Sequence, residues 1–515
     1  MGRLLKIYFW QIISILLSFA SLFVVTPYLT TNPGVFGIYT IVTSLVLFLS
    51  YADLGFIGAG TKYASEFFAQ KKLVKEIEMI GFVGFIFSGF ALLYTLVLFY
   101  LAYNPGILVK GLTINTEETA RKLLFVLAVS SPIFVGQRLL QIIFTVRLED
   151  YRYQRILILF NLIKIFSVLY FFREGRYDIV GFFIFSQVCG LFALICGAYV
   201  AKRNFSYDFK LLVKSLTYNK EIYLTVSKLA YSSLFLTVCW IAYYDLPPFV
   251  ISKTLGSYQV AMYAIGLTLI GLFRALFGVI FSPFNAKFNH YIGLKDIAGL
   301  KSFVIKVLGL SLPVTVFPVL IVSTTAKSFI YSWVGVSYAD SIAIAQFLVL
   351  SYIWSFISYP AGILIMAMEK VQSLIITSAI LPAIYWIGVA ISYRYWGIES
   401  FAIFKLIAFT FAAAAYTLIV LKLLDLTGKK LIADLVAPAI LPVILLIAML
   451  FFIRDYLPED KSKINLLIYG VANLFVFSFA TLVYYFTSKI FRLSINELFL
   501  KVRIRYLPMT GNNNI

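Results

Sequence analysis

Long runs of apolar residues recur along the chain, and short polar segments that carry Lys and Arg separate them. An α-helix needs about 17–25 mostly apolar residues to cross the roughly 30 Å of hydrocarbon in a bilayer. The runs are continuous and do not alternate in polarity over ten residues, so they predict membrane helices and not the strands of a barrel. Fourteen helices are predicted, over 7–29, 36–60, 79–103, 122–146, 156–172, 179–200, 228–250, 260–282, 303–326, 340–367, 373–393, 399–421, 435–453 and 464–488.

The composition is that of a chain covered by lipid. Of its 515 residues, 62% are hydrophobic and 13% are charged, with a mean hydropathy of +0.94. A soluble globular protein has about 45–50% apolar and about 25% charged residues. The apolar run that follows MGRLLK is too long for a signal peptide and has no small-residue cleavage site, so we expect it to be the first membrane helix.

The placement of Lys and Arg predicts the orientation of the helices. The net charge is +20, but the 43 basic residues lie in short groups between apolar runs, which argues against a nucleic-acid-binding face. With the N-terminus inside, 28 of them fall in cytoplasmic segments and 11 in outer segments. Because cytoplasmic loops of membrane proteins are enriched in Lys and Arg, we expect a multi-pass protein of the cytoplasmic membrane with both termini in the cytoplasm.

Catalytic and metal chemistry have little support in the sequence. The cysteines Cys189, Cys196 and Cys239 lie inside apolar runs, where small core residues are expected, and a single histidine, His290, gives no metal cluster. The GAGT sequence at 58–61 is too short for a phosphate-binding loop. The sequence therefore predicts no catalytic residue, no metal site and no cofactor.

Ionisable residues inside the predicted helices are the candidate functional residues. A charged group in hydrocarbon costs at least about 2.5–3.5 kcal/mol on insertion scales, so each one asks for a reason. Four are cationic, which suits a ligand that carries phosphate because Arg and Lys form charge-assisted hydrogen bonds with phosphate oxygens. The candidates are Asp53, Arg138, Lys164, Asp245, Arg274 and Lys405.

Local spacing indicates which cations face a polar interior. Asn161 and Lys164 are three residues apart and share one side of a helix, and Arg138 has Gln137 and Gln141 within one turn. Such stripes also occur where membrane helices pack against one another, so a packing role remains open.

The other candidates carry alternatives too. Arg274 lies between two glycines that leave room for a ligand, while Lys405, like Arg138, could reach the membrane surface instead. Asp53 and Asp245 are candidates for coupling to H⁺ or Na⁺, but either could pair with a basic residue or cap a broken helix.

The segment between the sixth and seventh predicted helices, 201–224, mixes aromatic and aliphatic residues with Lys and predicts an amphipathic interfacial helix. The tail over 492–507 has a similar pattern. Two segments, 26–41 and 246–265, share the order Pro, polar linker, Gly and apolar-x-Tyr helix start, a weak internal repeat of the kind found in secondary transporters.

The stretch GIYTIVTSLVLFLSYADLGF (37–56), the residues from Asp245 to Gly266, and SWVGVSYADSIAI (332–344) resemble the polysaccharide-biosynthesis flippases, the Wzx or O-antigen translocase type. That family lies within the multidrug/oligosaccharidyl-lipid/polysaccharide (MOP) exporter superfamily. The resemblance implies an all-α polytopic protein with two six-helix lobes around a central cavity plus two C-terminal helices. The implied divisions are an N-terminal lobe 1–200, a linker 201–227, a second lobe 228–430, two further helices 431–490 and a cytoplasmic tail 491–515.

The resemblance also implies a cargo, a polyprenyl-pyrophosphate-linked oligosaccharide moved across the membrane by alternating access. Membrane lipids and other polysaccharide-assembly proteins are the expected partners, with H⁺ or Na⁺ as a coupling ion. Alternatives are a peptidoglycan lipid-precursor flippase or a cation-coupled antiporter of the same superfamily. A membrane enzyme acting on lipid-linked sugars is a further alternative, although the outer loops are short for one.

Overall fold

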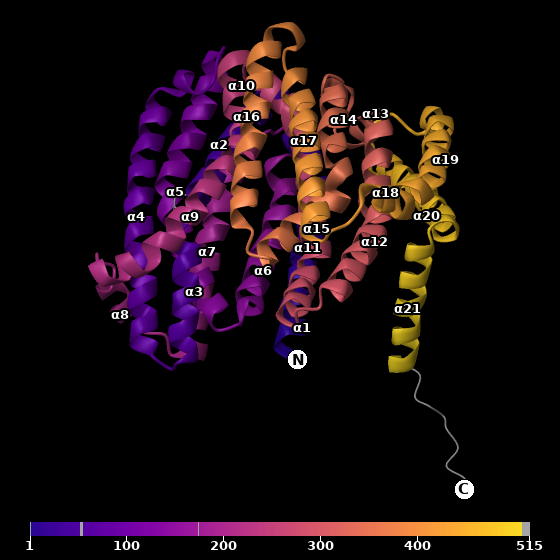
Figure 1. Ribbon diagram of the computed structural model, residues 1–515. Helices are drawn as coiled ribbons and strands as arrows, with labels where there is room; N and C mark the ends of the chain where they lie inside the picture. Colours follow the sequence, from indigo (N-terminus) through magenta and orange to yellow (C-terminus); the bar gives the residue numbers. More distant parts are fainter. Residues whose placement is uncertain (1, 52–54, 174, 507–515) are drawn as a thin grey trace, which may run out of the picture. The chain divides into compact units, whose positions relative to one another are not determined.

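The computed structural model describes residues 2–51, 55–173 and 175–506, and this part of the chain forms helices and turns with no strand. Figure 1 shows long helices packed side by side, such as α4 and α5. The all-α prediction is confirmed. The chain divides into two compact units, Met1–Ile265 and Gly266–Ile515.

The first unit contains ten helices, a 3₁₀ turn and the start of an eleventh helix within its described residues. They are α1 (Gly2–Leu29), α2 (Pro33–Tyr51), α3 (Phe56–Ala69), α4 (Leu73–Tyr103), η1 (Pro105–Ile107), α5 (Ile114–Val146), α6 (Asp150–Phe171), α7 (Ile179–Phe205), α8 (Phe209–Lys214), α9 (Lys220–Tyr244), α10 (Pro247–Leu255) and the first turns of α11 (Ser257–Gly293).

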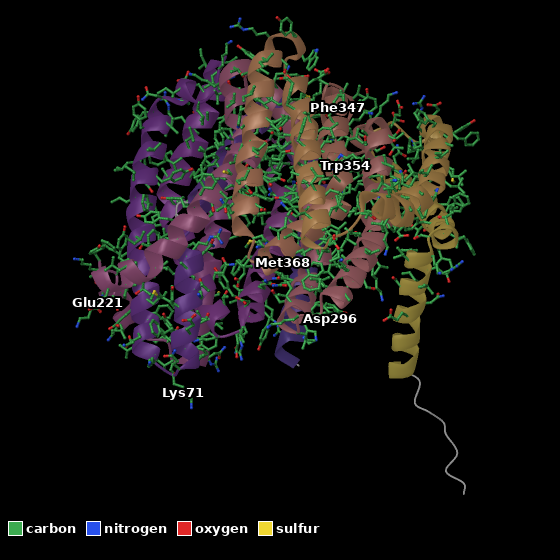
Figure 2. The ribbon with its side chains drawn as sticks, viewed as in Figure 1. Lys71, Glu221, Asp296, Phe347, Trp354 and Met368 are labelled. Carbon is green, nitrogen blue, oxygen red and sulfur yellow. The ribbon has the colours of Figure 1, made fainter. Side chains whose placement is uncertain are left out.

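The second unit continues α11 and ends in the C-terminal helix. Its elements are α12 (Ile297–Thr324), α13 (Ala326–Trp333), η2 (Val336–Tyr338), α14 (Ser341–Leu350), η3 (Ser351–Trp354), α15 (Ser355–Ala367), α16 (Val371–Trp396), α17 (Glu399–Leu423), α18 (Gly428–Leu431), the π turn η4 (Ile432–Val436), α19 (Ala437–Ile453), η5 (Arg454–Tyr456), α20 (Lys463–Thr487) and α21 (Lys489–Tyr506). In Figure 2, Asp296 and Met368 mark the turns before α12 and α16.

Thirteen stretches of the described chain are helical, long and apolar enough to cross a membrane, and each overlaps one predicted segment. The remaining prediction, 36–60, meets a shorter apolar stretch over Pro33–Leu49. The chain is a multi-pass membrane protein.

Three predicted helices are interrupted in the structure. Gly55 has φ +80°, a left-handed conformation that most residues avoid, and α3 starts after it, so 36–60 is not one continuous α-helix. The predicted helix 228–250 breaks between α9 and α10, where Pro247 and Pro248 lack the N–H groups that a continuing helix needs. A 3₁₀ turn that ends at Trp354 separates α14 from α15 (Figure 2).

The predicted amphipathic helix over 201–224 is also shorter than expected. α7 continues to Phe205, and only the six residues of α8 are helical before α9 begins at Lys220. The residues of the predicted amphipathic tail are helical in α21 as far as Tyr506.

The two segments of the weak internal repeat lie against each other in the first unit. Gly37 on α2 faces the first turn of α11, where a Cβ added at Gly37 would lie 1.9 Å from the carbonyl oxygen of Ser257. Nearby, Ser252 on α10 donates a hydrogen bond to the carbonyl of Leu108 at 2.7 Å, and the N–H of Lys110 donates to the carbonyl of Ser252 at 3.1 Å. A residue without a side chain is therefore required where these helices meet.

Candidate binding site

A cavity of about 300 Å³ lies inside the first unit, between α2, α5, α6 and α7. Lys164 is half-buried in its wall, with its ammonium 5.9 Å from the centre of the Phe182 ring. The other residues of the wall are Tyr39, Thr43, Val46, Ile133, Phe134, Gln137, Leu157, Phe160, Asn161, Phe183, Ser186, Gln187, Cys189, Gly190 and Ala193. Asn161 lines the same cavity as Lys164, as their spacing on one helix requires.

One amide in this wall is held in place by the neighbouring helix. The side chain of Gln137 on α5 donates a hydrogen bond to the carbonyl of Gly190 on α7 at 2.8 Å. A Cβ at Gly190 would lie 3.2 Å from that amide nitrogen, so the glycine lets the two helices approach closely enough for the bond. The bond leaves the amide oxygen of Gln137 as an acceptor for other groups.

A second cavity of about 220 Å³ adjoins the first, because Phe134, Gln137 and Leu157 line both. Its wall contains Arg138, whose guanidinium donates to the amide oxygen of Gln141 at 3.0 Å. We call the two cavities together the polar track. Lys164 lies in the wall of the first cavity and Arg138 in the wall of the second, and both residues were predicted from the sequence.

The electrostatics of the polar track favour an anion. Among the described residues that line it, Arg138 and Lys164 are cationic and no side chain is a carboxylate. In surroundings of low polarity, charge-assisted hydrogen bonds from such cations to phosphate oxygens are roughly twice as strong as neutral ones. Amide and hydroxyl groups of the wall, such as those of Gln187 and Ser186, can bind hydroxyl groups of a ligand.

The two other predicted cations lie in the second unit. Arg274 on α11 is half-buried and near Tyr359, and its flanking Gly271 and Gly278 open onto space where an added Cβ would meet nothing within 4 Å. Lys405 on α17 is only 1% exposed, and its ammonium lies 5.7 Å from the centre of the Tyr385 ring. The side chain of Lys405 is therefore enclosed by other residues of the protein.

The two predicted aspartates differ in how far the structure describes them. Asp53 lies outside the described residues. Asp245 is buried and directly follows α9 as its C-terminal cap residue, at the break that precedes Pro247. Among the described residues, no three His, Cys, Asp or Glu side chains gather into a candidate metal site.

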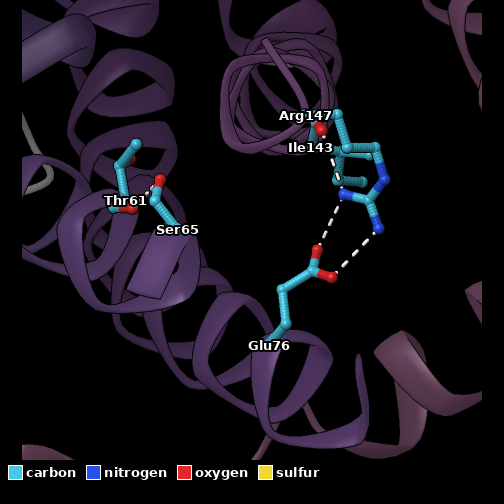
Figure 3. Close-up of polar contacts among 5 residues, drawn as sticks. All are labelled: Thr61, Ser65, Glu76, Ile143 and Arg147. Carbon is cyan, nitrogen blue, oxygen red and sulfur yellow. Dashed lines mark hydrogen bonds and ion pairs between the residues drawn. The ribbon is translucent and has the colours of Figure 1, made fainter. Parts of the chain in front are cut away.

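A buried ion pair in the first unit has no counterpart in the sequence-based predictions. The guanidinium of Arg147 donates to both oxygens of Glu76, at 2.7 and 3.0 Å, and to the carbonyl of Ile143 at 3.0 Å (Figure 3). The rings of Phe68, Phe205 and Tyr207 surround the guanidinium with centres 5.0–5.3 Å away. The pair joins the start of α4 to the end of α5. The residues are 71 positions apart, so local spacing carries no signal for it.

The residues of α2 and α7 in the polar track also have no counterpart among the sequence-based predictions. Thr43 on α2, together with Ser186 and Gln187 on α7, interrupts an otherwise apolar stretch, and that interruption is the signal that identifies them. Interrupted runs alone do not say which helices face one another.

The chain has the fold of transporters of the MOP superfamily. A solved structure of the lipid II flippase MurJ in an inward closed conformation matches with a TM-score of 0.67 and 14% identity, covering 92% of this chain and 99% of that one. An inward-facing multidrug resistance MATE transporter of the superfamily matches with a TM-score of 0.62 and 12% identity, covering 81% of this chain and 96% of that one.

A MOP superfamily transporter from Pyrococcus furiosus, described as having a binding pocket of reversed polarity that suggests a different function, matches with a TM-score of 0.51 and 14% identity. The match covers 82% of this chain and 96% of the Pyrococcus furiosus transporter. No family model matches the chain. No curated protein matches it either. These solved neighbours are transporters and flippases rather than enzymes.

Proposed function

We propose that the chain is a flippase that moves a polyprenyl-pyrophosphate-linked oligosaccharide across the cytoplasmic membrane by alternating access, for the assembly of a surface polysaccharide or glycan. The observation that carries the proposal is the polar track, two adjoining cavities with one cation each and no carboxylate among the described residues of their walls. A pyrophosphate fits that charge, and sugar hydroxyls fit the amides beside it.

The roles of the candidate residues follow from their charges. Arg138 and Lys164 bind the pyrophosphate, and Arg274 and Lys405 stabilise the anion elsewhere along its path. Asp53 and Asp245 remain candidates for the coupling ion, H⁺ or Na⁺. In this proposal the termini lie in the cytoplasm, the lobes are 1–200 and 228–430, and 201–227 links them.

A drug-exporting antiporter is less well supported. A cationic drug needs an acidic site, and the described wall of the polar track has no carboxylate. The likeness to the MATE transporter covers 81% of this chain, whereas the likeness to MurJ covers 92%. These coverages compare folds only. The proposed ligand is supported by the charge of the residues in the wall of the polar track.

The direct test is deletion of the gene, followed by measurement of lipid-linked glycans in each leaflet of the membrane. The proposal expects a lipid-linked oligosaccharide to accumulate on the cytoplasmic leaflet. Unchanged lipid-linked glycans in the deletion strain would contradict it.

Variants at the polar track connect that phenotype to the structure. Lys164→Ala removes a charge-assisted hydrogen bond of about 1.5–3 kcal/mol, so transport at subsaturating substrate should fall about 10- to 150-fold. Lys164→Arg keeps the charge and should retain more activity. Lys429→Ala, at an exposed position, is the matched control. Full transport by Lys164→Ala at normal membrane levels would refute the role of the polar track.

The second candidate is a peptidoglycan lipid-precursor flippase, which the fold match to the lipid II flippase favours. The cargo that accumulates distinguishes the two. Accumulation of lipid II on deletion, with rescue of a strain that lacks its own lipid II flippase, would support this candidate against the leading one.

A further inference from the structure

A third cavity, of about 440 Å³, lies in the first unit away from the polar track. We call it the α5 groove, because the third and fourth turns of α5 form much of its wall. Its residues are Ala102, Tyr103, Arg121, Lys122, Phe125, Val126, Val180 and Ile184. Apart from the two basic residues and the Tyr103 hydroxyl, every side chain in the wall is a hydrocarbon.

The α5 groove opens on the outer surface of the helical unit. Tyr103 is 73% exposed and Phe125 is 50% exposed, and the groove residues belong to helices long and apolar enough to span a membrane. A hydrophobic surface at that position faces lipid rather than water. The occupant that fits the apolar wall is therefore a hydrocarbon chain of a membrane lipid.

Charged residues are ordered along α5 beside the groove. Glu117 pairs with Arg121 at 3.3 Å, and Glu118 pairs with Lys122 at 2.6 Å. A rise of 1.5 Å per residue puts the two acids about 6 Å nearer the start of the helix than the two bases. Since the apolar wall continues at Phe125, the bases lie next to the groove and the acids lie one turn beyond them, towards water.

The start of α7, which adds Val180 and Ile184 to the wall of the groove, carries a charge pair with no net charge. At the start of α7, Asp178 accepts a hydrogen bond from the N–H of Gly181 at 2.7 Å and pairs with Arg176 at 3.2 Å. The charge pattern that a headgroup meets at the mouth is therefore set by α5, with cations at the level of the groove and anions above them.

We propose that the α5 groove binds an aminophospholipid, a lipid whose headgroup carries a phosphate followed by a primary ammonium. One acyl chain fills the groove, the phosphate contacts Arg121 and Lys122, and the ammonium contacts Glu117 and Glu118. The order of charges in that headgroup, phosphate near the chains and ammonium beyond it, matches the order along α5.

Other membrane lipids match this pattern less well. A headgroup with a net negative charge and no ammonium meets Glu117 and Glu118 without a partner for them. A choline headgroup has the right charges, but its quaternary nitrogen has no N–H to donate to a carboxylate. A polyprenyl pyrophosphate brings further negative charge towards the same two acids. The proposal therefore predicts selectivity among lipids and not merely lipid binding.

The test uses the purified full chain in detergent, to which phosphatidylethanolamine, phosphatidylglycerol, phosphatidylcholine or polyprenyl pyrophosphate is added. Native mass spectrometry counts the bound lipids, and thermal unfolding measures the stabilisation that each lipid gives. Phosphatidylethanolamine is expected to bind at least about tenfold more tightly than each of the others, the equivalent of one charge-assisted hydrogen bond of about 1.4 kcal/mol.

Two variants connect the selectivity to the groove. Exchanging the charges in both pairs (E117R, E118K, R121E and K122E together) keeps the composition and the ion pairs but reverses their order, so the preference for phosphatidylethanolamine should disappear. Ile184→Trp fills the groove and should release the acyl chain of any lipid there. The exposed Leu92→Trp, on the α4 surface outside the groove wall, is the matched control.

Each outcome decides the proposal. Selective binding of phosphatidylethanolamine that both groove variants abolish supports it. Equal binding of all four lipids, tighter binding of phosphatidylglycerol or polyprenyl pyrophosphate, or a preference that survives the exchanged pairs overturns it. The measurement does not depend on transport, so its result is independent of the function proposed above.

Discussion

Loss of Arg147 is expected to destabilise the first unit more than loss of any exposed basic residue. Glu76 is fully buried, and its carboxylate takes two hydrogen bonds from the Arg147 guanidinium. Removing one partner of a buried ion pair costs about 3–5 kcal/mol, because the remaining charge is left without compensation. Arg147→Ala also removes the contacts of the guanidinium with three aromatic rings.

Two further variants distinguish the loss of the ion pair from the cost of leaving one charge buried alone. Replacing both residues, Glu76→Leu with Arg147→Met, leaves no buried charge, so its cost should be far smaller than that of Arg147→Ala, and such replacements are often neutral or stabilising by about 1–4 kcal/mol. Arg147→Lys should lie between them, since an ammonium cannot contact both carboxylate oxygens as the planar fork does.

The assay is thermal unfolding of the purified protein in detergent at one fixed heating rate, because unfolding of a protein of this size is often irreversible. Glu459→Ala, which breaks the exposed pair with Lys327, is the control and should give a far smaller shift than Arg147→Ala. A melting temperature of Arg147→Ala equal to that of this control would refute the role of the ion pair. So would a double replacement that melts at as low a temperature as Arg147→Ala.

Three further changes test other contacts. Gly37→Ala should lower the melting temperature, because its Cβ would lie 1.9 Å from a main-chain oxygen of α11. Gly34→Ala, whose Cβ would have its nearest contact at 3.6 Å, is the control and should not lower it. Equal melting temperatures of the two variants would contradict the close approach. Gln137→Leu removes a second donor from a main-chain carbonyl of α7 that keeps its hydrogen bond within the helix, so it should cost about 0.5–1.5 kcal/mol in unfolding experiments, and an unchanged protein would show that the bond is dispensable. The hydrogen bond with the Glu459 carboxylate raises the pKa of Lys327 above its usual 10.5. The small stabilisation from this pair should therefore be constant from neutral pH to about pH 10 and disappear as the pH rises through the raised pKa. Melting of wild type and Glu459→Gln across that range measures the direction of this change.

The positions of the membrane helices could be predicted because they depend on a local property. A backbone in hydrocarbon must satisfy its own hydrogen bonds, so run length alone identifies a spanning helix. Hydropathy does not record backbone conformation, so run length predicted continuous helices across Gly55 and Pro247. The breaks were anticipated only as the alternative that Asp53 or Asp245 caps a broken helix. The length of α8 was overestimated, because the amphipathic pattern over 201–224 extends beyond the six residues that are helical.

The candidate site shows the same limit. Spacing placed Asn161 beside Lys164 on one helix, and the structure has both in one cavity wall. The contribution of α7 could not be predicted, because the bond from Gln137 to Gly190 joins residues 53 positions apart. Local periodicity assigns a residue to a helix face, and only packing decides which faces meet. The roles of these residues in transport stay predictions.

The separation of Glu76 from Arg147 bears on how the chain is made. The two residues are 71 positions apart, and at about 5–20 residues per second a ribosome takes roughly 4–14 s to synthesise that length. During that interval Glu76 has been synthesised and its partner has not. The pair that buries the carboxylate of Glu76 can therefore form only after α5 has been completed, so this ion pair sets an order for the last contacts of the first unit.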